Sequence, residues 1–198
     1  MKKLVFLVLM IFISVNTPVF ASNSFSDVQS QHENYAAIEL LAEKGIISGY
    51  PDGEFKPSNS ITRAEFTAIL CRFLGEAETA EKQNGETIFT DVAADHWASG
   101  YINYAYSNGI VNGMGDGSFA PMNNVTYEQV LKMVISSFGV TEAEVEVHGG
   151  YPNGYLLIAN RLDFGNKVEG GIGVLMTRGM VAQVMYNVIM LDDGEPEA

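Results

Sequence analysis

The stretch GIISGYPDGEFKP at residues 45–57 recurs as GIVNGMGDGSFAP at residues 109–121. The two copies share glycines, a proline, an Asp-Gly pair and apolar positions, which are the residues that set the backbone of a loop. The match extends to Phe-Ser-Asp-Val at 25–28 and Phe-Thr-Asp-Val at 89–92. Self-similarity at a fixed spacing predicts a protein built from repeated units.

Each unit is predicted to fold as a helix, a loop and a second helix. In the first unit, a helix is expected from about residue 32 to residue 44, where Gly45 suits a left-handed C-terminal cap. The loop follows with the turn Tyr-Pro-Asp-Gly at 50–53. The second helix is expected after Thr62, within Ile-Thr-Arg-Ala-Glu at 61–65.

A capping box is predicted at the start of this second helix. Thr62 is followed three residues later by Glu65, so each side chain can satisfy a backbone N–H of the first turn. Thr126 and Gln129 stand at the same places in the second unit and preserve that chemistry.

A third, eroded unit is expected near the end of the chain. Met-Thr-Arg at 176–178 resembles the Ile-Thr-Arg of the first unit, and the apolar residues after it have helical spacing. Met180 stands where the capping Glu is expected, so the box is half lost. The glycine-rich segment 165–173 replaces the Asp-Gly turn.

The chain divides as a signal peptide, three units, two linkers and a tail. Two lysines, an apolar run at 4–15 and Val-Phe-Ala at 19–21 predict secretion with cleavage after Ala21. An uncleaved anchor is the alternative, although the run is shorter than the ~20 residues that span a bilayer. No other apolar run is long enough to span a bilayer, so no membrane contact is expected after cleavage. The expected boundaries are 1–21 for the signal peptide, 22–75, 89–139 and 148–190 for the units, 76–88 and 140–147 for the linkers, and 191–198 for an acidic tail.

Composition excludes several classes of function. The formal net charge is −13, which argues against nucleic acid as a partner. Cys71 is the only cysteine, so no internal disulfide can form, and a partly buried free thiol is expected. His32, His96 and His148 suggest a metal, but a hydrogen bond to a helix start within each unit is the better interpretation. We expect no metal, no cofactor and no catalytic residues.

Together with His-Trp-Ala at 96–98, these motifs resemble the S-layer homology family over most of the chain after the signal peptide. The resemblance implies a mainly-α fold, with three helix-loop-helix repeats in a pseudo-threefold, three-pronged arrangement. It implies a protein of the cell wall or S-layer that binds a secondary cell wall polymer non-covalently. The polymer of this family is often an acidic, pyruvylated polysaccharide.

Four residues are candidates for binding such a glycan. Arg63 follows its cap, where free backbone N–H groups and a guanidinium would together favour a carboxylate. Arg178 occupies the same place in the third unit, whereas Tyr127 in the second unit brings no charge, so the groove around it should be weak or dead. The alternative for Arg63 is a structural ion pair or a solvated side chain. Trp97 is a candidate for stacking on a sugar, although core packing between prongs is the favoured alternative. Tyr50 is a candidate for the groove's border.

Two other functions compete with glycan anchoring. The same fold could serve protein–protein assembly at the cell envelope with weak or no glycan binding, which Tyr127 and the eroded third unit favour. A secreted enzyme of wall turnover is the third candidate, and no catalytic motif supports it.

Overall fold

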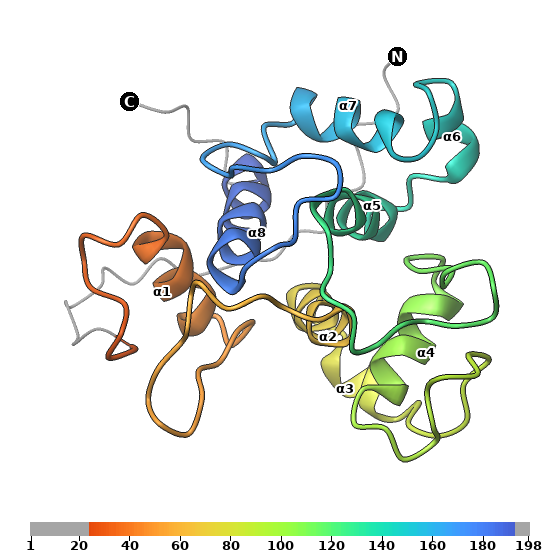
Figure 1. The fold of residues 1–198 in the computed structure, drawn as a ribbon, viewed down its shortest axis with the longest axis horizontal. Helices are drawn as coiled ribbons and strands as arrows, with labels where there is room; N and C mark the ends of the chain where they lie inside the picture. Colours follow the sequence, from red (N-terminus) through yellow and green to blue (C-terminus); the bar gives the residue numbers. More distant parts are fainter. Residues whose placement is uncertain (1–23, 193–198) are drawn as a thin grey trace.

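The computed structural model describes residues 24–192, which form eight α-helices and no β-sheet (Figure 1). The mainly-α prediction is therefore confirmed. The expected signal peptide and residues 193–198 lie outside the described residues. Within 24–192, no helix is long and apolar enough to cross a membrane. The helices are α1 (Tyr35–Glu43), α2 (Arg63–Phe73), α3 (Ala77–Glu81), α4 (Ser99–Ser107), α5 (Tyr127–Ser137), α6 (Glu142–Glu146), α7 (Asn153–Arg161) and α8 (Arg178–Asp192).

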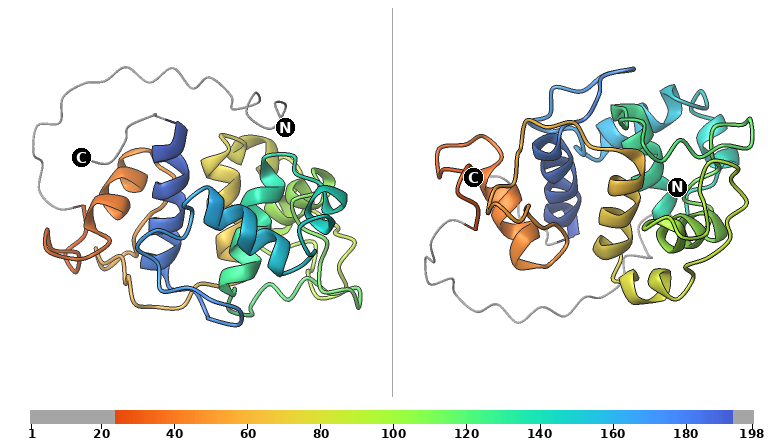
Figure 2. Two further views of the ribbon diagram at one scale, coloured as in Figure 1. Left: turned by 90° about the horizontal axis from the view of Figure 1, so that it is seen from above. Right: turned by 60° about the horizontal axis from the view of Figure 1, so that its bottom comes forward.

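The main helix contacts run between successive units. The second helix of one unit packs on the first helix of the next, as α2 on α4 and α5 on α7. The pattern closes on itself because α8 packs on α1, which both views of Figure 2 place side by side. Between units, α3 packs against both α2 and α4, and this short helix folds the segment expected to be a linker back onto both neighbours.

The three segments that lead into α2, α5 and α8 are joined by a closed ring of backbone hydrogen bonds. The N–H of Ile61 donates to the carbonyl of Met176 at 3.1 Å, that of Met176 to Val125 at 2.9 Å, and that of Val125 to Ile61 at 2.9 Å. All three side chains are buried. The ring supports the pseudo-threefold arrangement, which stays a prediction.

The aspartate of each Phe-x-Asp-Val motif fixes the loop that follows. The two carboxylate oxygens of Asp27 accept hydrogen bonds from the N–H groups of Phe55 and Lys56, both at 2.7 Å. Lys56 has a φ of 60°, a left-handed conformation that is uncommon for a non-glycine residue and that these two bonds stabilise. Asp91 holds Phe119 and Ala120 in the same way.

The capping boxes differ between units. Thr62 Oγ1 accepts from the N–H of Glu65 at 3.2 Å, and Glu65 Oε2 accepts from the N–H of Thr62 at 2.7 Å. In the second unit the N–H of Thr126 donates to Gln129 Oε1 at 3.3 Å, but Thr126 Oγ1 has no partner in the described part of the chain. The second box thus has the same arrangement as the first, but its hydroxyl lies outside hydrogen-bond geometry.

The third unit keeps the other half of its box. Thr177 Oγ1 accepts from the N–H of Met180 at 3.2 Å. Met180 has no carboxylate, so it cannot accept the reciprocal hydrogen bond from the N–H of Thr177. This is the half-lost box that the sequence predicts. This remaining half of the box lies at the start of α8, whose first residue is Arg178.

Cys71 is buried more completely than its sequence position suggested. Its side chain is 1% exposed, because it faces α4 where Sγ lies 3.8 Å from the carbonyl oxygen of Tyr101. Burial raises the pKa of the thiol to about 12. The expectation of a partly buried thiol is therefore wrong.

Two of the three histidines bind helix starts. Nδ1 of His32 accepts from the N–H of Asn34, and Nδ1 of His96 accepts from the N–H of Ala98, both at 3.1 Å. These bonds confirm the interpretation for two units. His148 is exposed, and its ring makes no such bond within residues 24–192.

Candidate functional site

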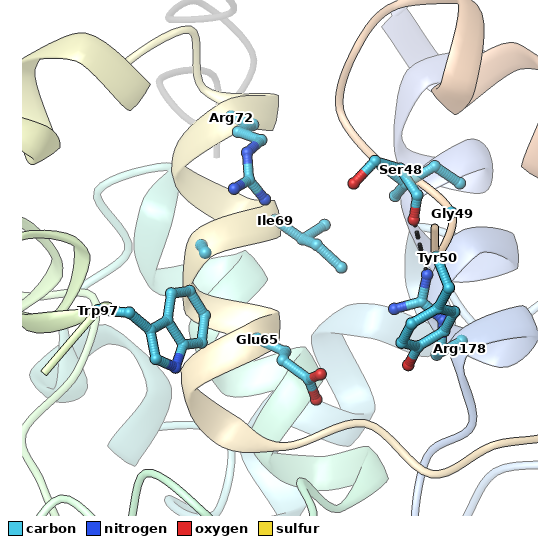
Figure 3. Close-up of a pocket in the computed structure, with 10 residues that line it drawn as sticks. Ser48, Gly49, Tyr50, Glu65, Ile69, Arg72, Trp97 and Arg178 are labelled. Atoms are coloured by element: carbon cyan, nitrogen blue, oxygen red, sulfur yellow. Dashed lines mark hydrogen bonds between the residues drawn. The ribbon is translucent and has the colours of Figure 1, made fainter. Parts of the chain in front are cut away.

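A cleft of about 180 Å³ lies between α2 and the loop that follows α1. Figure 3 shows its two walls, one formed by α2 with Trp97 beside it and the other formed by the loop with the first residue of α8. The polar and aromatic side chains or backbone groups that line it belong to Ser48, Tyr50, Glu65, Arg72, Trp97 and Arg178. The volume is below the roughly 300–1,000 Å³ of pockets for drug-sized ligands, so the cleft suits a small group such as one sugar unit.

Arg178 is held rigidly in one wall. Its Nε donates to the carbonyl of Phe55 and its Nη2 to the carbonyl of Ser48, both at 2.8 Å. Its guanidinium also lies over the rings of Tyr50 and Phe55, at 4.9 and 4.4 Å from their centroids. None of the described carboxylates forms an ion pair with it. The side chain is fixed, and its positive charge has no counter-ion.

Arg72 places a second guanidinium in the opposite wall. It lies 5.5 Å from the centroid of the Tyr101 ring and, among residues 24–192, makes no ion pair with a carboxylate. Sequence reasoning missed this residue. The signal was available, because Arg72 follows Glu65 by seven positions and residues with that spacing share one face of a helix.

Trp97 is 51% exposed and lies at the cleft. The alternative that it packs in the core is therefore wrong. It precedes the first residue of α4 by two positions, and its ring stacks on that of His96 at 5.9 Å. Tyr50 lies in the other wall, with Lys56 Nζ 4.7 Å from its ring centroid. The cleft thus offers an open indole on one side and a phenol flanked by cations on the other.

The single carboxylate of the cleft is already engaged. Glu65 Oε2 accepts from both the N–H and the hydroxyl of Thr62, at 2.7 and 2.8 Å. The cleft therefore has two guanidinium groups against one capping carboxylate, and it is locally positive in a chain of net charge −13.

Arg63 lies outside this cleft. It is 5% exposed, and its Nε donates to the carbonyl of Phe119 at 2.9 Å. Burial lowers its pKa, and the nearby Tyr151 and Asp91 act in the opposite direction. Arg63 grips the second unit's loop as Arg178 grips the first unit's loop. The structure thus brings Arg178, Tyr50 and Trp97 together and leaves Arg63 apart.

The helix starts do not offer the free backbone N–H groups that the sequence suggested. The N–H of Arg178 donates to Asn59 and that of Gly179 to Pro57, each at 2.9 Å. Arg63 and Ala64 are bonded in the same way to the segment before α5. Any anion held here must be bound by side chains, because those donors are already used.

Tyr127 fills the corresponding place in the second unit. It is 9% exposed and packs against the glycine-rich segment 165–173. A Cβ added at Gly170 would lie 2.3 Å from Cε2 of Tyr127, so glycine is required for this approach. The tyrosine and the glycines of the third unit thus form one matched contact, and it contributes no charge.

The sequence pattern of the S-layer homology domain matches residues 24–67 and 88–131. The chain carries S-layer homology domains. The third unit is outside the matched residues. Similar proteins include the middle cell wall protein of Brevibacillus brevis, 30% identical over 78% of this chain and 14% of its own length. Others are a cellulosome-anchoring protein of Acetivibrio thermocellus, 39% identical over 58% of this chain and 26% of its own length, and an endoglucanase of a Bacillus species, 36% identical over 68% and 14%.

The chain spans about a quarter or less of the length of these relatives. The domain matched in this chain is a binding module of the cell surface. The chain is therefore a secreted protein associated with the cell wall.

Proposed function

We propose that this chain anchors itself to the cell wall by binding an acidic, pyruvylated secondary cell wall polysaccharide in the cleft between α2 and the loop after α1. Binding is non-covalent, and no bond is made or broken. One observation carries the proposal: the guanidinium groups of Arg178 and Arg72 form no ion pair with any described carboxylate and line the same cleft as the exposed ring of Trp97.

The chemistry of such a glycan matches these groups. A pyruvyl ketal presents a carboxylate, which accepts charge-assisted hydrogen bonds from a guanidinium worth roughly 1.5–3 kcal/mol each. The C–H face of a sugar ring packs on an open indole, and Trp97 offers one at the rim. Because Arg178 is already fixed by two backbone carbonyls, little conformational entropy is lost when it binds.

The experiment is co-sedimentation of the mature chain with purified cell walls, before and after removal of the pyruvyl groups. Arg72→Gln and Trp97→Ala change side chains that make little contribution to the core, so each should fold normally and bind at least about tenfold more weakly. Arg161→Gln, on the exposed end of α7, is the matched control and should bind normally. Undiminished binding to depyruvylated walls, or by both cleft variants, would refute the proposal.

One observation favours assembly with envelope proteins as a second candidate function. In the loop before α8, Ile172 and Leu175 are 61% and 50% exposed, which is unusual for large apolar side chains lying so close together. If this loop binds a protein, a pull-down from cell envelopes should recover a partner with the wild type and lose it with Ile172→Ser. Recovery of polymer alone by both chains would count against assembly.

A further inference from the structure

A second positively charged position, on α5, is occupied by a carboxylate of the chain itself. Lys132 Nζ lies 2.9 Å from Oε1 of Glu142, and Nδ2 of Asn112 donates to the same oxygen at 2.9 Å. The ammonium also lies 5.5 Å from the centroid of the Tyr151 ring. We call Lys132, Asn112 and Tyr151 the Lys132 site.

The aromatic residue of the Lys132 site is the counterpart of Trp97. Each of the two rings is 51% exposed and precedes a first helix of a unit. Each contacts the tyrosine four residues later, Trp97 with Tyr101 at 6.4 Å and Tyr151 with Tyr155 at 6.2 Å. The loop edge corresponds as well, since Asn112 stands in the second unit where Ser48 stands in the first.

One detail sets the Lys132 site apart from its counterpart. Tyr101 donates its hydroxyl to Glu81 at 2.8 Å, whereas the hydroxyl of Tyr155 is buried without a partner among the described residues. Lys132 Nζ lies 5.9 Å from the centroid of that Tyr155 ring. The other nearby carboxylate, Glu128, accepts from the N–H of Gly173. Glu142 is thus the group that neutralises Lys132.

We propose that Glu142 imitates the carboxylate of a ligand and competes with acidic glycans for the Lys132 site. This inference rests on the proposed function of the first cleft. A carboxylate held by an ammonium and an amide beside an exposed aromatic ring shows which chemistry the site accepts. While Glu142 is in place it neutralises Lys132, and the guanidinium of Arg63, which lies near Tyr151, is buried and held by the carbonyl of Phe119. Glu142 therefore decides how many glycan carboxylates one chain can hold.

The competition is weak enough to measure. The side chain of Glu142 is 66% exposed and that of Lys132 is 23% exposed, and exposed ion pairs are displaced easily. Removing the negative charge should therefore tighten the second binding event by about two- to fivefold.

The sequence offers a probe that separates the two positions. Trp97 is its only tryptophan and lies at the first cleft, so its fluorescence responds to occupancy there and not at the Lys132 site. The ligand used is a methyl hexoside carrying a 4,6-O-pyruvyl ketal, titrated into the mature chain by calorimetry and by fluorescence. The variants are Glu142→Gln and its matched control Glu146→Gln, which removes the same charge from the same helix.

We expect Glu142→Gln to leave the fluorescence titration unchanged and to add or tighten a second, fluorescence-silent event in calorimetry. Glu146→Gln should behave as the wild type. Coinciding curves for Glu142→Gln and the wild type would overturn this inference while leaving the first cleft intact. If the Trp97 fluorescence of the wild type does not change during the titration, the result would instead count against the proposed function. Even then, a calorimetric event that appears only in Glu142→Gln would support the inference.

Discussion

Nη2 of Arg178 lies 2.8 Å from the carbonyl oxygen of Ser48, a residue 130 positions earlier in the chain. The bond joins the start of the last helix to the loop after the first helix (Figure 3). It also fixes the guanidinium at the edge of the cleft. One side chain therefore contributes to closure of the fold and to the charge of the site.

Replacing Arg178 should impair both properties. Arg178→Gln removes two charge-assisted bonds to backbone carbonyls, so the free energy of unfolding should fall by about 3 kcal/mol. Wall binding should fall by at least about tenfold. Arg178→Lys keeps the charge and should retain part of the wall binding at a similar loss of stability. Urea denaturation and co-sedimentation measure the two effects, and a native-like stability of Arg178→Gln would contradict the structural role.

The two caps of the first and second units should respond differently to the same substitution. Thr62→Val removes a complete capping box and should destabilise the protein by about 1 kcal/mol. Thr126→Val removes a buried hydroxyl that has no hydrogen-bond partner within residues 24–192, so it should be neutral or stabilising by up to about 1 kcal/mol. Thermal unfolding of both variants tests this contrast. Equal losses would mean that the Thr126 hydroxyl is satisfied in solution.

The contact between Tyr127 and the glycine-rich segment should tolerate no added carbon. Gly170→Ala would place a Cβ 2.3 Å from the Tyr127 ring, and overpacking of this kind costs about 1–3 kcal/mol. At Gly171 the nearest atom to a Cβ is a methyl of Val174 at 3.6 Å, an ordinary contact, so Gly171→Ala is the matched control. Denaturation curves should separate the two variants. Combining Gly170→Ala with Tyr127→Ala should recover much of the loss, which a strain unrelated to Tyr127 would not allow.

Cys71 should make stability depend on alkaline pH. Burial raises the pKa of its thiol from 9.0 to about 12, so the unfolded chain loses this proton first. The contribution of this thiol to the free energy of unfolding is complete below pH 9 and is lost as the pH rises from 9 towards 12. The slope for one such group is about 1.4 kcal/mol per pH unit.

Cys71→Ala provides the comparison for this effect. Burial raises the pKa of Tyr101 and Tyr104 as well, so some alkaline loss remains in the variant. The difference in unfolding free energy between wild type and variant, measured by urea denaturation from about pH 8 to about pH 11, isolates the thiol. A difference that does not change with pH would show that the thiol ionises in the folded protein.

Local features of the fold were predictable because they depend on nearby residues. The cap at Thr62, the positive φ of Gly45 and the Asp-Gly turn follow from backbone chemistry within a few positions. Helix pairing was not predictable in this way. The apolar stripe of α2 shows which face of the helix is buried, but it does not show which helix packs against that face. In this fold the helix is α4.

The candidate site was predictable only in part for the same reason. The matching positions of Arg63 and Arg178 made them look equivalent, and both do grip a loop carbonyl. Their difference comes from what the packing places opposite them. Arg72 and Trp97 meet Arg178 across a cleft only because α2 lies opposite the loop held by α8. The spacing of residues in the sequence does not indicate that α2 lies opposite this loop.

The packing of α8 on α1 has a consequence for how this protein is made. A polypeptide that emerges amino end first presents α1 to its surroundings long before α8 exists. Until α8 has been synthesised, the face of α1 that packs on it lacks this partner. The contact that closes the fold can therefore form only after the segment that contains α8 has been synthesised.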